Sequence, residues 1–307
     1  MINASKYSIY PLSLSLALTS KKHLRYMAQI PSHAVQPNLS PDPRIRNIIA
    51  VGSGKGGVGK STTAVNLAIA LSQLGLRVGV LDADVYGPSI PMMLGSRERP
   101  ESPDNKTIEP LRAHGLQLMS IGALVDQEDT AMIWRGPMAT SALTQLFADT
   151  RWDALDILVI DLPPGTGDIQ LTLAQKIPVA GAVIVTTPQD IATLDARKAV
   201  KMFEKVQVPV LGIVENMAVH VCSNCGHAEH IFGEGGGAKM AERYGVPLLG
   251  SLPLDIRIRE QGDAGTPVMV AEPQSGVGQA YRQVAERLLE ALDKRPRAPM
   301  SISATLV

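Results

Sequence analysis

The segment GKGGVGKS, residues 54–61, constrains the fold of this chain more than any other feature. It follows an apolar run, residues 47–53, that predicts a buried strand, and it opens a stretch, residues 60–74, with the apolar spacing of an amphipathic helix. In a glycine-rich loop between a strand and a helix, backbone N–H groups and the helix N-terminus face an anion. Because the segment fits G-x-x-x-x-G-K-[ST] in full, we predict a phosphate-binding loop.

The residues of this loop have separate predicted tasks. Its glycines let the backbone wrap the phosphates without a clash at Cβ; they are Gly54, Gly56, Gly57 and Gly59. Lys60 is expected to bridge the β- and γ-phosphates of a nucleoside triphosphate, and Ser61 to supply an oxygen to Mg²⁺. A glycine-rich turn without a ligand is the plain alternative.

The rest of the chain alternates short apolar runs with helical stretches. Predicted strands cover residues 47–53, 77–84, 116–122, 157–165, 181–188, 208–217 and 246–255. Continuous apolar strands separated by helices indicate a mostly parallel sheet with helices on both faces. We therefore predict an α/β fold whose ligand site lies at the carboxyl ends of the strands.

Polar residues stand at three of these strand ends. Asp82 and Asp84 end the second predicted strand, and Asn216 closes the sixth. Asp161 follows four apolar residues, and because a buried carboxylate is costly unless it meets a cation, we expect it to meet Mg²⁺ through water. The amide of Asn216 can both donate and accept at a purine edge. An Asx-type cap at the aspartates and an ordinary loop position for Asn216 are the alternatives.

The only two cysteines of the 307 residues, Cys222 and Cys225, form one C-x-x-C. Two cysteines are too few for a disulfide framework, so a reducing compartment is expected. Thiolates select iron–sulfur clusters or zinc. A 4Fe–4S cluster usually takes four thiolates, which two chains related by a two-fold axis would supply.

Three alternatives for the cysteine pair stay open. His227 and His230 could complete a zinc site within one chain, although their spacing is tighter than is usual for structural zinc. The pair could be a redox couple, although that motif usually opens a helix in a thioredoxin-like unit. Buried, inert cysteines are the third alternative, which the polar segment HVCSNCGHAEH disfavours.

A second lysine inside the loop, Lys55, makes KGGVGKS resemble the deviant Walker A loop of the MinD/ParA and nitrogenase iron protein class. The resemblance implies that Lys55 reaches the nucleotide of a facing subunit, so that the protein acts as a homodimer. A solvated loop lysine is the plain alternative. The nucleotide contacts that the class implies within the loop are Gly54, Lys55, Gly56, Gly57, Val58, Gly59, Lys60, Ser61 and Thr62.

Further segments are similar to the same class. DAD, residues 82–84, resembles its first switch, which implies that Asp84 positions or deprotonates the attacking water and that Asp82 lies close to the metal. VIDLPPGTGD, residues 159–168, resembles Walker B with the second switch. Asn216 resembles the asparagine that binds adenine in this class. The catalytic residues thus implied are Lys55, Lys60 and Asp84.

Six segments together resemble the Mrp/ApbC group of iron–sulfur cluster carrier ATPases over about residues 45–290: GSGKGGVGKST, LDADVYGPSIP, WRGPM, DLPPGTGD, TTPQD and CSNCGH. The resemblance implies slow, Mg²⁺-dependent ATP hydrolysis. It also implies a 4Fe–4S cluster held by Cys222 and Cys225 at a dimer interface, received from cluster donors and passed to apo-proteins. A regulatory switch of the MinD/ParA type and a zinc-stabilised ATPase are the alternatives. WRGP, residues 134–137, has no explanation beyond a Gly-Pro turn.

The predicted organisation is one ATPase domain, residues 45–295, between a poorly ordered segment, 1–44, and a flexible tail, 296–307. Bacterial members of the group often carry a small extra domain before the loop, so residues 1–44 are expected to be a leader or a remnant of it. Residues 1–41 contain lysine and arginine but no acidic residue, as in a mitochondrial transit peptide. We expect a cytoplasmic protein, with the mitochondrial matrix as the alternative.

Charge and hydropathy exclude two kinds of partner. The net charge is zero and the sequence pI about 7.0, so no strong field draws the protein to nucleic acid or anionic lipid. No apolar run reaches the ~18 residues that span a bilayer. The predicted C-terminal helix, residues 277–294, has an ordinary charged face with Arg282, Glu286, Arg287 and Glu290. We therefore expect neither nucleic acid nor a membrane as a partner.

Overall fold

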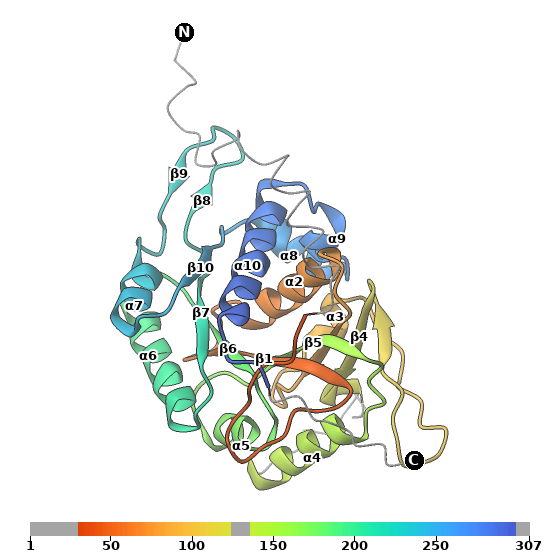
Figure 1. Cartoon of the computed structure of the whole chain (residues 1–307). Coiled ribbons are helices and arrows are strands. Elements are labelled where there is room, and N and C mark those ends of the chain that lie inside the picture. Colours follow the sequence, from red (N-terminus) through yellow and green to blue (C-terminus); the bar gives the residue numbers. More distant parts are fainter. Residues whose placement is uncertain (1–29, 124–135, 299–307) are drawn as a thin grey trace.

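Strand β1 (Ile45–Ser53) lies inside the sheet, and every residue of it except Arg46 is buried. The computed structural model describes residues 30–123 and 136–298. In that part of the chain eight strands form one sheet in the order β10-β7-β6-β1-β5-β2-β4-β3 (Figure 1). All neighbouring strands run parallel except β3 and β4. The predicted mostly parallel α/β fold is confirmed.

The predicted strands are all present, although several end earlier than predicted. The other strands of the sheet are β2 (Val78–Asp82), β3 (Leu111–Ala113), β4 (Leu116–Ser120), β5 (Leu155–Asp161), β6 (Gly181–Thr186), β7 (Val210–Glu215) and β10 (Leu248–Ser251). Strand β5, for example, ends at Asp161 rather than at residue 165, because the Pro-Pro-Gly that follows forms a loop. Asp82 and Asp161 are the last residues of β2 and β5, whereas Asp84 and Asn216 lie in the loops that follow β2 and β7.

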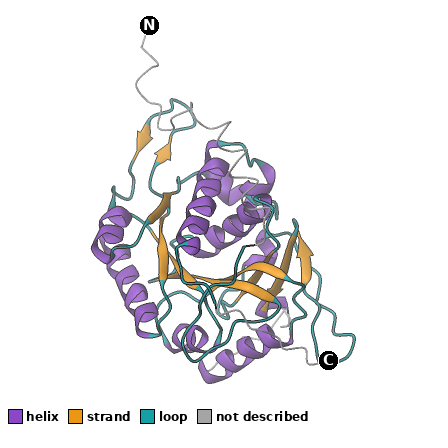
Figure 2. Cartoon of the chain, viewed as in Figure 1, coloured by secondary structure: helices purple, strands orange, loops and turns teal. Residues whose placement is uncertain are grey.

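Helices cover both faces of the sheet (Figures 1 and 2). One face packs against α2 (Lys60–Gln73), α3 (Ile90–Met93), α9 (Val268–Ala271) and α10 (Gly276–Asp293). The other packs against α4 (Gly136–Asp149), α5 (Asp168–Lys176), α6 (Asp190–Lys205) and α7 (Gly236–Tyr244). Helix α8 (Ile256–Asp263) lies beside α3 and α9. No helix of the described residues is long and apolar enough to cross a membrane.

The edge strand β3 was not predicted. It pairs antiparallel with β4, and the two residues between them, His114 and Gly115, have φ of 49° and 80°. Two left-handed residues in a two-residue loop suit the right-handed twist of a hairpin. In the segment LRAHG only the glycine indicates a turn, because a strand of three residues is too short to show a periodic pattern.

Residues 30–44 precede the sheet and lie against it. Ile30 is buried in the core, and the buried His33 pairs with Arg297 in an antiparallel bridge. The backbone N–H of Ala34 donates to the carbonyl of Pro296, at 2.8 Å. This described part of the N-terminal segment is therefore held by the C-terminal residues 296–298, while the predicted boundaries at 44 and 295 stay a prediction.

Candidate functional site

The glycine-rich loop joins β1 to α2, as predicted, and close packing explains two of its glycines. A Cβ on Gly54 would lie 2.0 Å from the backbone carbon of Asp195 in α6. A Cβ on Gly59 would lie 2.1 Å from Nδ2 of Asn216, and Gly59 also has a φ of 79°. No atom lies within 4 Å of a Cβ added at Gly57, so only its φ of 80° favours glycine at this position.

Lys60, the first residue of α2, gathers three other predicted site residues around its ammonium group. Its Nζ lies 2.7 Å from Oδ1 of Asp161, 3.1 Å from Oγ of Ser61 and 3.8 Å from Oδ2 of Asp84. Lys60 and Asp161 are both buried. The structure therefore brings together residues from the start of α2, the end of β5 and the loop after β2.

Two buried carboxylates stand side by side at this place, because Asp82 and Asp161 are register partners at the ends of β2 and β5. Burial raises the pKa of Asp161, against the opposing charge of Lys60. Burial, and then the charge of Asp161, raises the pKa of Asp82 to about 7. Each carboxylate is thus costly to keep ionised until a further cation arrives.

The oxygen atoms at this place fit a magnesium ion. Oδ2 of Asp161 is buried and has no hydrogen-bond partner among the described residues. The carboxylate of Asp161, the hydroxyl of Ser61 and the nearby Asp82 are hard oxygen ligands of the type that Mg²⁺ prefers. The Asx-type alternative also holds in part, since Asp82 accepts from the N–H groups of Asp84 and Ile90 at 3.2 and 3.1 Å.

Lys55 takes no part in this cluster. It is half-buried, and its carbonyl accepts a hydrogen bond from Oγ of Ser53 at 2.8 Å. Its ammonium group makes no hydrogen bond or ion pair with residues 30–123 or 136–298. The side chain is therefore available to a partner outside the described chain.

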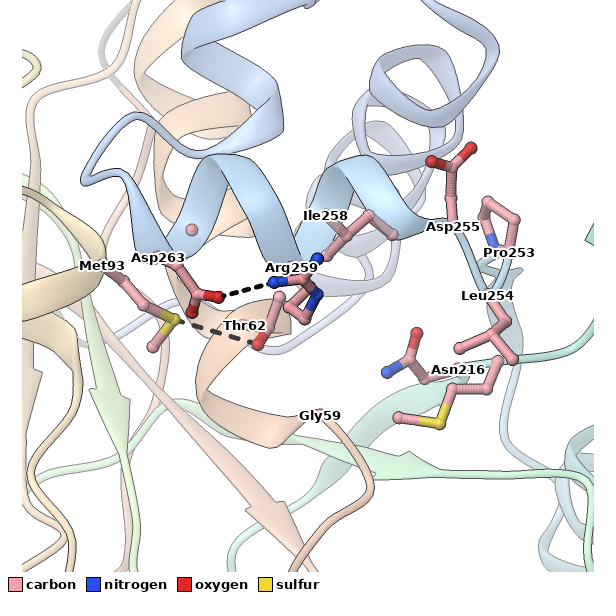
Figure 3. A pocket seen from close by; sticks show the side chains of 12 residues that line it. Gly59, Thr62, Met93, Asn216, Pro253, Leu254, Asp255, Ile258, Arg259 and Asp263 are labelled. Atoms are coloured by element: carbon pink, nitrogen blue, oxygen red, sulfur yellow. Dashed lines mark hydrogen bonds and ion pairs between the residues drawn. The ribbon is translucent and has the colours of Figure 1, made fainter. Parts of the chain in front are cut away.

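A pocket of about 220 Å³ continues from the loop along the carboxyl ends of the strands (Figure 3). Asn216 lines it, and its Nδ2 donates to the carbonyl of Val58 at 2.9 Å. The lining residues are Gly59, Thr62, Met93, Asn216, Met217, Pro253, Leu254, Asp255, Ile258, Arg259, Gly262 and Asp263. The contribution of residues 253–263 was not predicted, although LPLD, residues 252–255, ends the last predicted strand and so lies at the edge of the sheet where a ligand site is expected.

Cys222 and Cys225 lie away from this pocket, in the turn of a hairpin formed by β8 (His220–Val221) and β9 (Ala228–Glu229). The hairpin projects from the domain (Figure 1). Cys222 is half-buried and Cys225 exposed, and both thiols are free. The backbone N–H groups of Cys225 and Asn224 lower the pKa of the Cys222 thiol and so favour the thiolate that binds metals.

The histidines of this hairpin do not complete a metal site in the single chain. Nδ1 of His230 bonds to the carbonyl of Ala218 at 2.8 Å, and Nε2 of His227 lies 3.7 Å from Glu229. Within the described residues, no three side chains of the types His, Cys, Asp and Glu group as metal ligands. One chain therefore offers two thiolates, and any further ligand has to come from outside it.

The family model described as "ParA: NUBPL iron-transfer P-loop NTPase" matches residues 44–289. Two similar proteins are each named iron-sulfur cluster carrier protein. The one from Haemophilus influenzae is 65% identical over 245 residues, which are 80% of this chain and 66% of that protein. The one from Pseudomonas fragi is 60% identical over 258 residues, which are 83% of this chain and 90% of that protein. The chain thus spans about two thirds of the first relative's length.

Two solved structures share the fold. A nucleotide-binding protein in complex with ADP from Archaeoglobus fulgidus is 38% identical, with a TM-score of 0.65, over 76% of this chain and 90% of that one. The cell division ATPase MinD from Pyrococcus furiosus is 24% identical, with a TM-score of 0.60, over 80% of this chain and 98% of that one. The second likeness concerns the fold alone.

Proposed function

From the premise that the chain belongs to the NUBPL iron-transfer P-loop NTPases of the ParA family, we propose that it is an ATP-hydrolysing iron–sulfur cluster carrier. Two copies would hold one 4Fe–4S cluster between them and pass it to apo-proteins. The observation that carries the proposal is the pairing of a complete phosphate-binding loop with a projecting hairpin that holds half of a four-thiolate set.

The nucleotide would lie along the carboxyl ends of the strands. The N–H groups of the loop and the N-terminus of α2 would receive the phosphates. Lys60, drawn from Asp161 by the phosphate charge, would bridge the β- and γ-phosphates. Asn216 would bind the adenine in the pocket that it lines.

Ser61, Asp161 and Asp82 would hold Mg²⁺ with the phosphates. The metal would neutralise negative charge on the phosphate oxygens. The buried Asp84 lies 3.8 Å from Lys60, close to where the γ-phosphate would sit. It would orient the attacking water or accept its proton.

A second copy of the chain would complete both sites. Lys55, which has no partner among the described residues, would reach the nucleotide of the facing copy. Cys222 and Cys225 from each copy would give the cluster four thiolates on the two-fold axis. Because Cys225 is exposed, a recipient apo-protein could reach the bound cluster, and a cluster donor could reach the empty site.

We place this activity in the cytoplasm, because two free cysteines suit a reducing compartment. The mitochondrial alternative depends on residues 1–41, most of which lie outside the described part of the chain. That neither nucleic acid nor a membrane is a partner stays a prediction. The regulatory-switch alternative has only the MinD fold in its favour.

Anaerobic reconstitution with iron and sulfide tests the proposal. The wild type should gain the visible absorption of an iron–sulfur cluster together with bound iron and sulfide. Cys222→Ala should lose both, whereas Ser223→Ala, in the same turn, should keep them. Full cluster content in Cys222→Ala would refute the thiolate site, and bound zinc without iron would favour the zinc-stabilised ATPase.

A further inference from the structure

One short segment of the chain faces both the nucleotide pocket and the cysteine hairpin. Residues 252–255 connect β10 to α8, and Pro253, Leu254 and Asp255 line the pocket on the side where Asn216 lies (Figure 3). The pocket and the cysteine hairpin therefore both contact residues 252–255, which are called the pocket wall below.

The other side of this wall is hydrogen-bonded to the base of the hairpin. The N–H of Ala218 donates to the carbonyl of Leu252 at 2.9 Å, and the N–H of Leu254 donates to the carbonyl of Val219 at 2.8 Å. The next link is made by a side chain. Nδ1 of His220 lies 3.1 Å from the carbonyl oxygen of Leu254, and because that oxygen only accepts, Nδ1 carries the proton and donates.

The backbone that connects the pocket to the hairpin is constrained near both of its ends. Met217 lines the pocket between Asn216 and Ala218, and it has a φ of 56°, which a residue with a side chain rarely adopts. At the far end of the cysteine loop, the buried Glu215 accepts from the N–H of Gly237 at 2.7 Å. Residues 217–237 are thus hydrogen-bonded near both ends, by Ala218 to Leu252 and by Gly237 to Glu215.

We propose that His220 is a positioning residue that couples the nucleotide pocket to the two thiols. The inference rests on the proposed function, in that the pocket takes the nucleotide. A base that enters the pocket contacts Leu254, whose carbonyl oxygen holds His220. His220 begins β8, and Cys222 stands two residues later in the chain. Because such coupling is reciprocal, a ligand on the thiols also changes the affinity for the nucleotide.

The cysteine content makes the test specific. Cys222 and Cys225 are the only cysteines of the chain, so the rate at which a thiol reagent labels the metal-free protein reports on the hairpin alone. The rate is measured with and without a non-hydrolysable ATP analogue and Mg²⁺. Affinity for the analogue is measured separately by titration calorimetry for each protein.

Three substitutions separate coupling from general damage. His220→Ala removes the bond to Leu254, and His220→Asn keeps an N–H donor at the place of Nδ1. His227→Ala changes an exposed histidine of the same hairpin that has no bond to the pocket wall. The wild type, His220→Asn and His227→Ala should show a labelling rate that the analogue changes about fivefold or more. His220→Ala should bind the analogue with unchanged affinity and lose this response.

Other results of these measurements would overturn the role of His220, the coupling or the proposed function. A full response in His220→Ala, or no rescue by His220→Asn, would overturn the role of His220. A lost affinity for the analogue in His220→Ala would place the residue in the binding machinery and overturn the coupling role. A wild type that binds the analogue without any change in labelling would overturn the coupling while the nucleotide site stands. A wild type that does not bind the analogue would refute the proposed function, and the inference with it.

Discussion

The ammonium group of Lys60 lies 2.7 Å from Oδ1 of Asp161, and both side chains are buried. The positive charge of Lys60 opposes the burial that raises the pKa of Asp161. In the proposed function Lys60 binds the phosphates instead, and Mg²⁺ replaces it as the cation that neutralises Asp161. The pair therefore links the stability of the free protein to its ability to bind nucleotide.

Lys60→Ala should lose both phosphate affinity and stability. Removing one partner of a buried ion pair leaves an uncompensated charge, which typically costs about 3–5 kcal/mol. Urea unfolding and nucleotide titration measure the two losses. Adding Asp161→Asn to Lys60→Ala should restore much of the stability without the affinity, because the buried charge is then gone. Lys55→Ala, whose side chain has no partner in the described chain, should unfold like the wild type.

Asp84→Ala should bind ATP and hydrolyse it slowly. A positioned general base typically contributes about 10²- to 10⁴-fold to a rate, so phosphate release should fall by about 100-fold or more. Nucleotide titration should show affinity close to that of the wild type, since Asp84 lies 3.8 Å from Lys60 and makes no direct hydrogen bond to it. Unchanged turnover would remove Asp84 from the catalytic residues.

The stability of the metal-free, nucleotide-free protein should depend on Asp82 between about pH 4 and 7. The pKa of Asp82 is raised from 3.8 to about 7 in the folded chain, so the folded state binds a proton that the unfolded state has released. Stability therefore falls as pH rises through this window. Asp82→Asn removes that penalty, so its unfolding free energy relative to wild type should increase from pH 4 to pH 8. A pH-independent difference between the two proteins would contradict the raised pKa.

Gly59→Ala and Gly57→Ala should separate crowding from backbone strain. Both glycines have a left-handed φ, which costs a residue with a Cβ about 1–2 kcal/mol. Only at Gly59 would the added Cβ collide with Asn216, at 2.1 Å from Nδ2. Gly59→Ala should therefore lose far more ATP affinity than Gly57→Ala in a parallel titration. Equal losses would mean that the contact with Asn216 is not important for binding.

The site could be predicted largely from local sequence, because its residues follow strands. An apolar run followed by Asp161, or by Glu215 and Asn216, identifies a strand end, and parallel strands bring such ends together. The glycine-rich loop motif allowed the prediction that this site binds phosphate. The cluster around Lys60 then follows from the order of β1, β2 and β5 in the sheet.

Other features depend on contacts between distant segments, which a single sequence does not reveal. His220 and Leu254 are 34 residues apart, and neither shows in its local pattern that one bonds to the other. The same applies to helix α8, whose residues line the pocket without a motif. The bridge between His33 and Arg297 joins the two ends of the described chain. Trp134 and Arg135 of the WRGP motif lie outside the described residues.

Native mass spectrometry of the reconstituted protein distinguishes one cluster shared by two chains from one cluster on each chain. We expect a dimer that carries a single 4Fe–4S mass, and a monomer without a cluster in Cys222→Ala and Cys225→Ala. A cluster on each monomer, or a dimer that carries zinc in place of iron and sulfide, would contradict this expectation.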